Sequence, residues 1–340
     1  ESMQIQRFAF PILADVKSRL AYRAQAYVRD EVALYQPSAE DLDYPARLER
    51  ARDDGAEGGS EAEGTSEFRS WYPPLQQTLL LLAQLYRCVD SLTFGGLAQE
   101  ALKVCVDQIM SASAQIVKKT GSTMDGHLFL IKHLLALREQ IAQFDADFGT
   151  IEKELDFTHM RDHVKRIMGG QASLFALGSS NAVLQLLGRG RPRVNPRHVD
   201  SKKELEKQLK AACEAFIMTV TKATVEPMLG FITKVTALQV TGSQQALREH
   251  AFASVPKISG VVKSVHEHLD AVLPSASGKL KLYLSNPRTR AILLKPIKSN
   301  ITEAHAQIAA LLEREYTEED RQSVSLKPTE ELQALLDMLD

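Results

Sequence analysis

The chain has 340 residues, more than one hydrophobic core usually organises, so we expect two packed units or one elongated stack of helices. Aromatic residues make up only 6% of it, which favours helices over a β-rich fold. Its 41 basic and 43 acidic side chains nearly cancel, which excludes a whole-chain field able to hold a phosphate backbone or an anionic membrane. Cys88, Cys105 and Cys213 lack zinc-ligand spacing and fall on or beside apolar stripes, so we expect buried thiols in a reducing compartment.

The ends and the apolar runs of the sequence give two further expectations. The longest strictly apolar run, Leu79 to Ala83, is far shorter than the roughly 20 residues of a membrane-spanning helix, so we expect no span. The opening Glu-Ser-Met has no signal-peptide pattern behind it and is typical of an expression scar, so we expect missing sequence upstream.

The N-terminal segment, 1–46, has helical apolar spacing that Pro11 interrupts, because proline cannot donate an intrahelical hydrogen bond. We expect Pro11 to start a new helix or to kink one, which gives two helical pieces that together complete a bundle lying upstream. The next segment, 47–70, is acidic and rich in glycine, and Glu49 to Glu67 contains no large apolar residue. Burial cannot offset the ordering entropy of such a stretch, so we predict a disordered loop.

Segment 71–187 is predicted to form a helical bundle. Pro73 and Pro74 suit the start of a helix, and three stripes with 3.6-residue spacing follow. The stripe within 128–144 is apolar over much of the helix circumference, so we expect this helix at the centre of the bundle. The three stripes comprise Leu75, Leu79, Leu82, Tyr86 and Val89; Leu102, Cys105, Ile109 and Ile116; and Leu130, Leu134, Leu137, Ile141 and Phe144.

A basic loop, 188–199, and a second helical bundle, 200–340, are predicted to follow. Residues 169–198 hold seven glycines or prolines, which marks a boundary. Within the second bundle we expect Pro227 to kink or divide a helix. Period-two alternation is nowhere long enough for a sheet. The predicted fold is therefore all-α, with irregular helical bundles in series forming an elongated rod and no significant sheet.

None of the candidate metal-binding or catalytic motifs has the residue spacing that its chemistry requires. A helix would point His159 and His163 the same way, but no third ligand accompanies them, and Met160 stands where zinc proteases carry glutamate. His266 and His268 lie about 200° apart on a helix and cannot share a metal ion. Phosphate-loop, calcium-loop and hydrolase patterns also fail. We predict no catalytic, metal-binding or cofactor-binding residues, and an interaction protein rather than an enzyme.

The sequence GRGRPR, Gly188 to Arg193, is the motif that most merits weighing. Arg-Gly-Arg-Pro is the centre of the AT-hook, whose arginines enter the minor groove of A·T-rich DNA. A single copy in a slightly acidic helical chain fits better a surface loop that touches a partner, a lipid headgroup or water. The candidate interaction loop comprises Arg189, Arg191, Arg193 and Arg197.

Several strings of the sequence are similar to one family. The longest is DGHLFLIKHLLALREQIAQF, from Asp125 to Phe144. Others run in the same order along the chain: YRAQAYVRD from Tyr22, DLDYPARL from Asp41, WYPPL from Trp71, LYRCVD from Leu85, GLAQEAL from Gly96, LDF from Leu155, DSKKELEKQLKAACE from Asp200, YLSNP from Tyr283 and LLKPIKSNI from Leu293. Together they resemble the third subunit of the conserved oligomeric Golgi complex.

This resemblance implies a non-enzymatic helical scaffold in a vesicle-tethering complex that acts in retrograde transport within the Golgi. It implies a peripheral protein, in the cytosol or held by its partners on the cytosolic face of Golgi membranes, without a cofactor and without nucleic acid. The implied partners are other subunits of the complex, and also SNAREs, Rab GTPases or coat proteins. Family members carry an N-terminal coiled-coil region that is not evident here, so the chain resembles the C-terminal portion. The resemblance does not assign a functional role to any individual residue of this chain.

Two other readings stay open at this point. A nuclear adaptor would read DNA through the arginine loop, and it would show a strong salt dependence that is lost when Arg191 and Arg193 are replaced. Direct membrane contact would need a helix with a large apolar face and a Lys/Arg-rich polar face. We rank that reading last because no segment combines the two.

Overall fold

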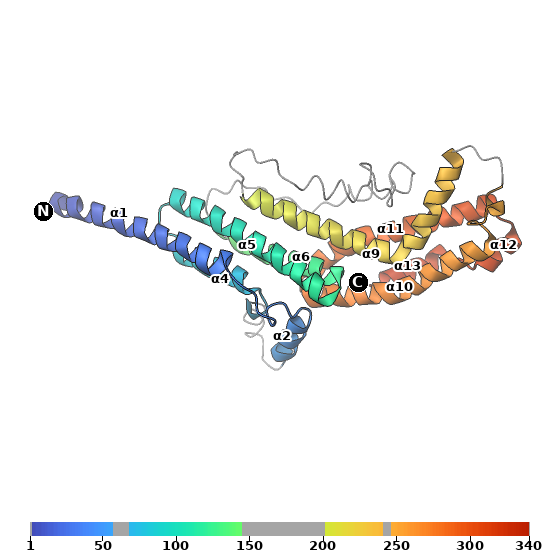
Figure 1. The fold of residues 1–340 in the computed structure, drawn as a ribbon, viewed down its shortest axis with the longest axis horizontal. Helices are drawn as coiled ribbons and strands as arrows, with labels where there is room; N and C mark the ends of the chain where they lie inside the picture. The colour runs from blue at the N-terminus through green and yellow to red at the C-terminus, as the bar shows by residue number, and fades with distance from the viewer. Residues whose placement is uncertain (1, 57–67, 145–200, 241–245, 340) are drawn as a thin grey trace. The chain divides into compact units, whose positions relative to one another are not determined.

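The computed structural model describes residues 2–56, 68–144, 201–240 and 246–339 (Figure 1). These residues form helices, turns and loops without any strand, which confirms the all-α prediction for the part of the chain described. The chain divides into two compact units, one of Glu1–Lys153 with Pro196–Cys213 and one of Glu154–Asn195 with Glu214–Asp340. The boundaries predicted from sequence, and their arrangement as a rod, stay predictions.

The N-terminal part of the first unit differs from two expectations. Helix α1 continues through Pro11, so a new helix does not start there as one alternative had predicted; the proline removes only one main-chain donor. Helix α2 covers the first half of the predicted loop, because Leu48 anchors it in the core and its Ala, Arg and Glu residues favour helix. The helices are α1 (Ser2–Tyr27), the π-helix η1 (Val28–Ala33) and α2 (Ala46–Ala56).

Three further helices build the core of this unit: α4 (Pro73–Leu85), α5 (Ser91–Thr120) and α6 (Thr123–Ile141). Helix α5 ends at Gly121, whose φ of 69° is left-handed, and Ser122 then caps α6 by accepting from the Asp125 amide. This short connection folds α6 back against α5, and α6 also packs on α4. Buried residues occur around α6, among them Leu128, Phe129, Ile131, Leu134 and Leu137, as expected for a central helix.

The second unit takes the C-terminal part of α9 (Ser201–Val240), η2 (Leu247–Glu249), α10 (Val255–Tyr283), α11 (Pro287–Glu315), α12 (Glu318–Val324) and α13 (Thr329–Asp337). Pro227 lies inside α9 without dividing it, and Figure 1 shows that the helix bends along its length. On α10, Ile258, Val262, Val265 and Leu269 form a buried stripe that continues through Leu273.

Helix α9 is long and apolar. In the described ranges it is the one helix that could cross a membrane by length and composition, and 56% of its most apolar window is buried within the structure. Core helices pass the same criteria, so this is weak evidence for a span.

Candidate interaction surface

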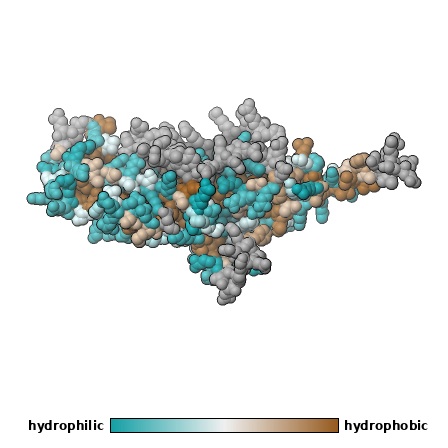
Figure 2. Space-filling view, turned by 180° about the vertical axis from the view of Figure 1, so that it is seen from behind, coloured by the Kyte–Doolittle hydropathy of each residue, from teal (hydrophilic) through white to brown (hydrophobic). Residues whose placement is uncertain are grey.

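Helix α1 presents large apolar side chains that nothing in the described structure covers. Phe10 and Ile12 are each 65% exposed, Val16 is 54% exposed and Leu13 is 50% exposed. Figure 2 shows this end of the molecule as a run of hydrophobic surface that reaches the grey terminus. A contiguous exposed apolar patch on a folded chain marks an interaction site, because leaving it in water is costly.

Leu13 and Val16 share one face of the helix, and Phe10 and Ile12, which point about 200° apart, lie at the two edges of that face. Leu13, Val16 and Leu20 follow one another at intervals of three and four residues, which places them in one stripe. The same stripe continues through Ala24 and Val28, which are buried. The covered end and the bare end therefore belong to a single packing face, and only the C-terminal end has found helices to pack on among the residues described.

The covered end is held by η1, α4 and α5. Val28 and Val32 are buried where η1 packs on these two helices. The side-chain amide of Gln108 donates a hydrogen bond of 2.6 Å to the carbonyl oxygen of Ala33, and that of Gln25 donates one of 3.4 Å to Glu100. These contacts fix the direction in which α1 leaves the unit.

The other side of α1 is polar. Asp15 and Arg19 form an exposed ion pair of 2.9 Å across one helical turn. Lys17 is an exception, because it lies one turn from Leu13 on the side of the stripe and is half-buried near Asp90. Hydrogen bonds from Thr93 chiefly lower the pKa of Asp90, and Lys17 contributes in the same direction. The helix is therefore amphipathic. In proteins most of the stability of a helix comes from the packing of its apolar face, so burial of this face would contribute most of the stability of α1.

A buried polar cluster around His133 is the strongest alternative site in this unit. The amide of Tyr72 donates to Nε2 of His133 over 3.0 Å, and Nδ1 donates to the carbonyl oxygen of Phe129 over 2.8 Å. The Tyr44 hydroxyl donates to the carbonyl oxygen of Ser70 over 2.8 Å. Burial lowers the pKa of His133 to about 3 and raises those of both tyrosines. A neutral, bonded and inaccessible imidazole joins chain segments rather than serving a substrate.

The residues singled out in the sequence divide between described and undescribed parts of the chain. Arg189, Arg191, Arg193 and Arg197, with His159 and His163, lie outside the described residues. His266 is half-buried and its Nε2 has no hydrogen-bond partner, whereas His268 is exposed. No group of three His, Cys, Asp or Glu residues that could hold a metal occurs in the described ranges.

The three cysteines differ in exposure. Cys105 and Cys213 are buried, as predicted, and burial raises the pKa of Cys105 to about 12. Cys88 is exposed, so the prediction was wrong there: it lies in the turn after α4 ends at Leu85, where the helical spacing of the predicted stripe no longer holds. The sequence analysis also did not identify the exposed face of α1, because a stripe of apolar residues has the same pattern in the sequence whether a core or a partner covers it.

The fold defines a helical-bundle protein, and α1 gives it an exposed apolar helix face. The family model for conserved oligomeric Golgi complex subunit 3, C-terminal, matches residues 1–160, and the COG3 C-terminal cap domain matches residues 208–339. Together the two models match most of the chain. The chain belongs to the family of conserved oligomeric Golgi complex subunit 3.

Individual relatives agree with this assignment. The chain is 35% identical to the subunit 3 of Homo sapiens over 96% of its own length and 45% of the relative. It is 34% identical to that of Aedes aegypti over 97% of its length and 43% of the relative. The subunit of Saccharomyces cerevisiae is 22% identical over 75% of the chain and 38% of the relative. The chain therefore spans less than half the length of these relatives. No solved structure matches it.

Proposed function

We propose that the chain is part of a non-enzymatic subunit of a Golgi vesicle-tethering complex, a helical scaffold for protein–protein contacts in retrograde transport within the Golgi. Its family membership supports this, since the relatives carry the name of a subunit of an oligomeric Golgi complex. The observation that carries the proposal is the apolar stripe of α1, exposed from Phe10 to Leu20. Shape and contact area, rather than chemistry, would then produce the function.

The partners in this proposal are the other subunits of the complex, with SNAREs, Rab GTPases or coat proteins as further contacts. The protein would be peripheral, held on the cytosolic face of Golgi membranes through these partners. The closed cluster around His133 supports a non-enzymatic role, because an active site needs polar groups that a substrate can reach.

The bare face of α1 has a definite occupant in this proposal. The human relative is about twice as long as the region that matches, so a full-length protein has further residues. We place helices formed by those residues on Leu13, Val16 and Leu20, where they complete a bundle with segment 1–46. The free energy gained by burying these side chains would hold the two parts of the subunit together.

Co-purification tests the function. The tagged full-length protein is isolated from its native cells in mild salt, and the accompanying proteins are identified by mass spectrometry. The expected result is a stoichiometric set of large helical Golgi subunits. Recovery of chromatin proteins, or of nothing stoichiometric, would contradict the tethering role and return attention to the arginine loop.

A two-chain experiment tests the occupant of α1 separately. The rest of the full-length polypeptide is expressed as its own chain and mixed with this 340-residue chain. The double variant L13D/V16D should lose the association, because it would bury two carboxylates without partners. The variant S18D, on the polar side of the same helix, should retain it. Equal binding by both variants would show that the α1 face packs on something else.

A further inference from the structure

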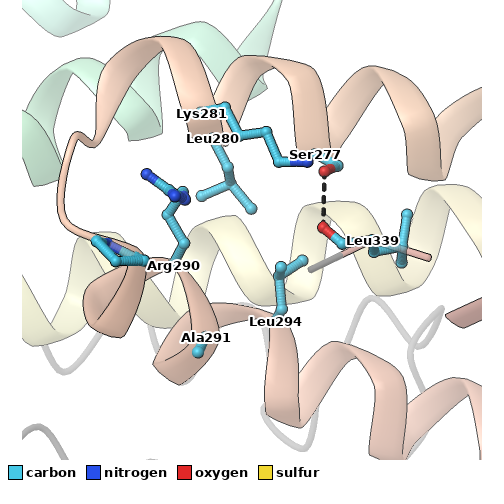
Figure 3. A pocket seen from close by; sticks show the side chains of 8 residues that line it. Ser277, Leu280, Lys281, Arg290, Ala291, Leu294 and Leu339 are labelled. Carbon is cyan, nitrogen blue, oxygen red and sulfur yellow. Dashed lines mark hydrogen bonds between the residues drawn. The ribbon is translucent and has the colours of Figure 1, made fainter. Parts of the chain in front are cut away.

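The last described residues of the second unit form a short latch. We define this latch as residues 325–339, which comprise the connector after α12 and helix α13. It packs on α11 and buries Leu332, Leu336 and Leu339. The Ser277 hydroxyl on α10 donates a hydrogen bond of 2.9 Å to the carbonyl oxygen of Leu339, which anchors the end of the latch (Figure 3).

The latch depends on this packing for its structure. A helix of nine residues is not stable by itself in water, so α13 relies on its buried leucines and on the bond from Ser277. A cavity of about 320 Å³ adjoins this bond, and Leu280, Leu294 and Leu339 line it (Figure 3). Packing is therefore incomplete at the end of the latch. Segments with little packing open at a lower free energy than the whole fold, so we expect the latch to open before α10 and α11 do.

A buried histidine of α11 lies against the connector of the latch. His305 is 3% exposed, and among the described residues neither of its ring nitrogens has a hydrogen-bond partner of good geometry. The main chain of Lys327, in the connector, lies next to the ring. Burial lowers the pKa of His305, and the main chain of Lys327 offsets only part of this effect. The imidazole is therefore neutral while the latch is closed, and opening of the connector would hydrate it.

A second histidine, from α10, lies beside the first. His266 is half-buried, and its Nε2 has no hydrogen-bond partner in the part of the chain that the structure describes. Burial chiefly lowers the pKa of His266, and the charges of Lys327 and His305 lower it further. Asp270 on α10 and Glu331 on α13 act in the opposite direction, and Glu331 also forms an ion pair of 3.4 Å with Lys327. In the closed latch both histidines therefore disfavour a proton.

We propose that residues 325–339 are an acid-sensitive latch, which closes over neutral His305 and His266 and opens as a local unit when these histidines take up protons. In the open state each ring lies in water, where its pKa is about 6.5. Because the closed state lowers the pKa of both groups, closure is most stable above about pH 6.5 and weakens as the pH falls below that value. Each histidine can raise the opening constant by at most about tenfold per pH unit. This device does not depend on the function proposed above.

Hydrogen exchange measured by mass spectrometry tests the latch in the 340-residue chain. Peptides that cover 325–339 are followed at pH 7.5 and pH 5.5, and the rates are corrected for the intrinsic effect of pH on exchange. Peptides from the first half of α10 serve as an internal reference. The protection of the latch should fall by about tenfold between the two pH values, and that of the reference should fall less.

Variants separate the effect of protonation from that of packing. The double variant H266Q/H305Q carries neither titrating ring, so the protection of its latch should change by less than about twofold over the same range. H266Q alone, at a half-buried position, should keep the latch closed at pH 7.5 and lose part of the response, which keeps the test decisive if the double variant does not close.

The control is S277A, which deletes the bond to Leu339 without removing a titrating group. It should lower the protection of the latch about fivefold at both pH values and keep the pH dependence of wild type. Equal pH dependence in wild type and H266Q overturns the proposal. So does a loss of protection in α10 as large as that in the latch, because the acid would then unfold the unit as a whole.

Discussion

The hydroxyl of Ser113 on α5 donates a hydrogen bond of 2.9 Å to the carbonyl oxygen of Gly126 on α6. The Ser113 side chain on α5 can approach the main chain of α6 this closely because Gly126 carries no Cβ. A Cβ at this position would clash with Cγ2 of Val117 and come within 3.2 Å of the Ser113 hydroxyl. The packing of the central helix of the first unit thus rests on a glycine.

Gly126→Ala should therefore destabilise the first unit, by about 1–3 kcal/mol, the usual cost of forcing atoms into a packed core. Trp71 is the only tryptophan and is buried in this unit, so its fluorescence during urea denaturation reports the unfolding of this unit. The control is Gly96→Ala on α5, where nothing lies within 4 Å of the added Cβ. It should raise stability by about 0.5–1 kcal/mol, because alanine favours helix. Equal midpoints for both variants would contradict the close approach.

Tyr44→Phe should lower the free energy of unfolding of the same unit by about 1 kcal/mol, because it deletes the buried hydrogen bond to the Ser70 carbonyl. Tyr22→Phe provides the control, since Tyr22 is 70% exposed on α1 and its change should stay within about 0.5 kcal/mol. Both are measured by the fluorescence of Trp71. A Tyr44 variant as stable as wild type would show that the bond to Ser70 contributes nothing net.

Parts of this structure follow from local sequence pattern and parts do not. The central position of α6 could be predicted, because apolar residues around a helix leave it nowhere but the interior. The unbroken course of α1 through Pro11 could not, since one lost hydrogen bond only biases a helix. Helix α2 was not predicted, because Leu48, the buried residue that holds it in the core, lies just before the stretch that contains no large apolar residue.

The candidate sites were harder to predict than the fold. The stripe of Leu13, Val16 and Leu20 is visible in the sequence, but its exposure depends on which helices are present to cover it.

Thiol labelling checks the exposure of the three cysteines. A water-soluble thiol reagent should modify Cys88 rapidly in the native chain and leave Cys105 and Cys213 intact. Denaturant should expose all three, the full cysteine content of the chain. Peptide mapping by mass spectrometry identifies the labelled sites, and Cys88→Ser should abolish native labelling. Rapid native modification of Cys105 would contradict its burial against α4.

Acidification should destabilise the first unit through His133. Burial lowers the pKa of His133 to about 3 in the folded state, whereas the unfolded chain protonates near pH 6.5, so protons bind the unfolded state preferentially as the pH falls below 6.5. Between pH 7 and pH 5 this group alone should cost about 2 kcal/mol of unfolding free energy. His127, whose pKa burial also lowers, adds to the loss with the same sign.

His133→Gln separates this contribution from the others. A glutamine oxygen can still accept the hydrogen bond from the Tyr72 amide, but it does not titrate between pH 7 and pH 5. Urea denaturation followed by Trp71 fluorescence should show a smaller loss of stability on acidification in this variant than in wild type. Parallel curves for wild type and His133→Gln would mean that water or a carboxylate reaches the imidazole and lets it protonate in the folded state.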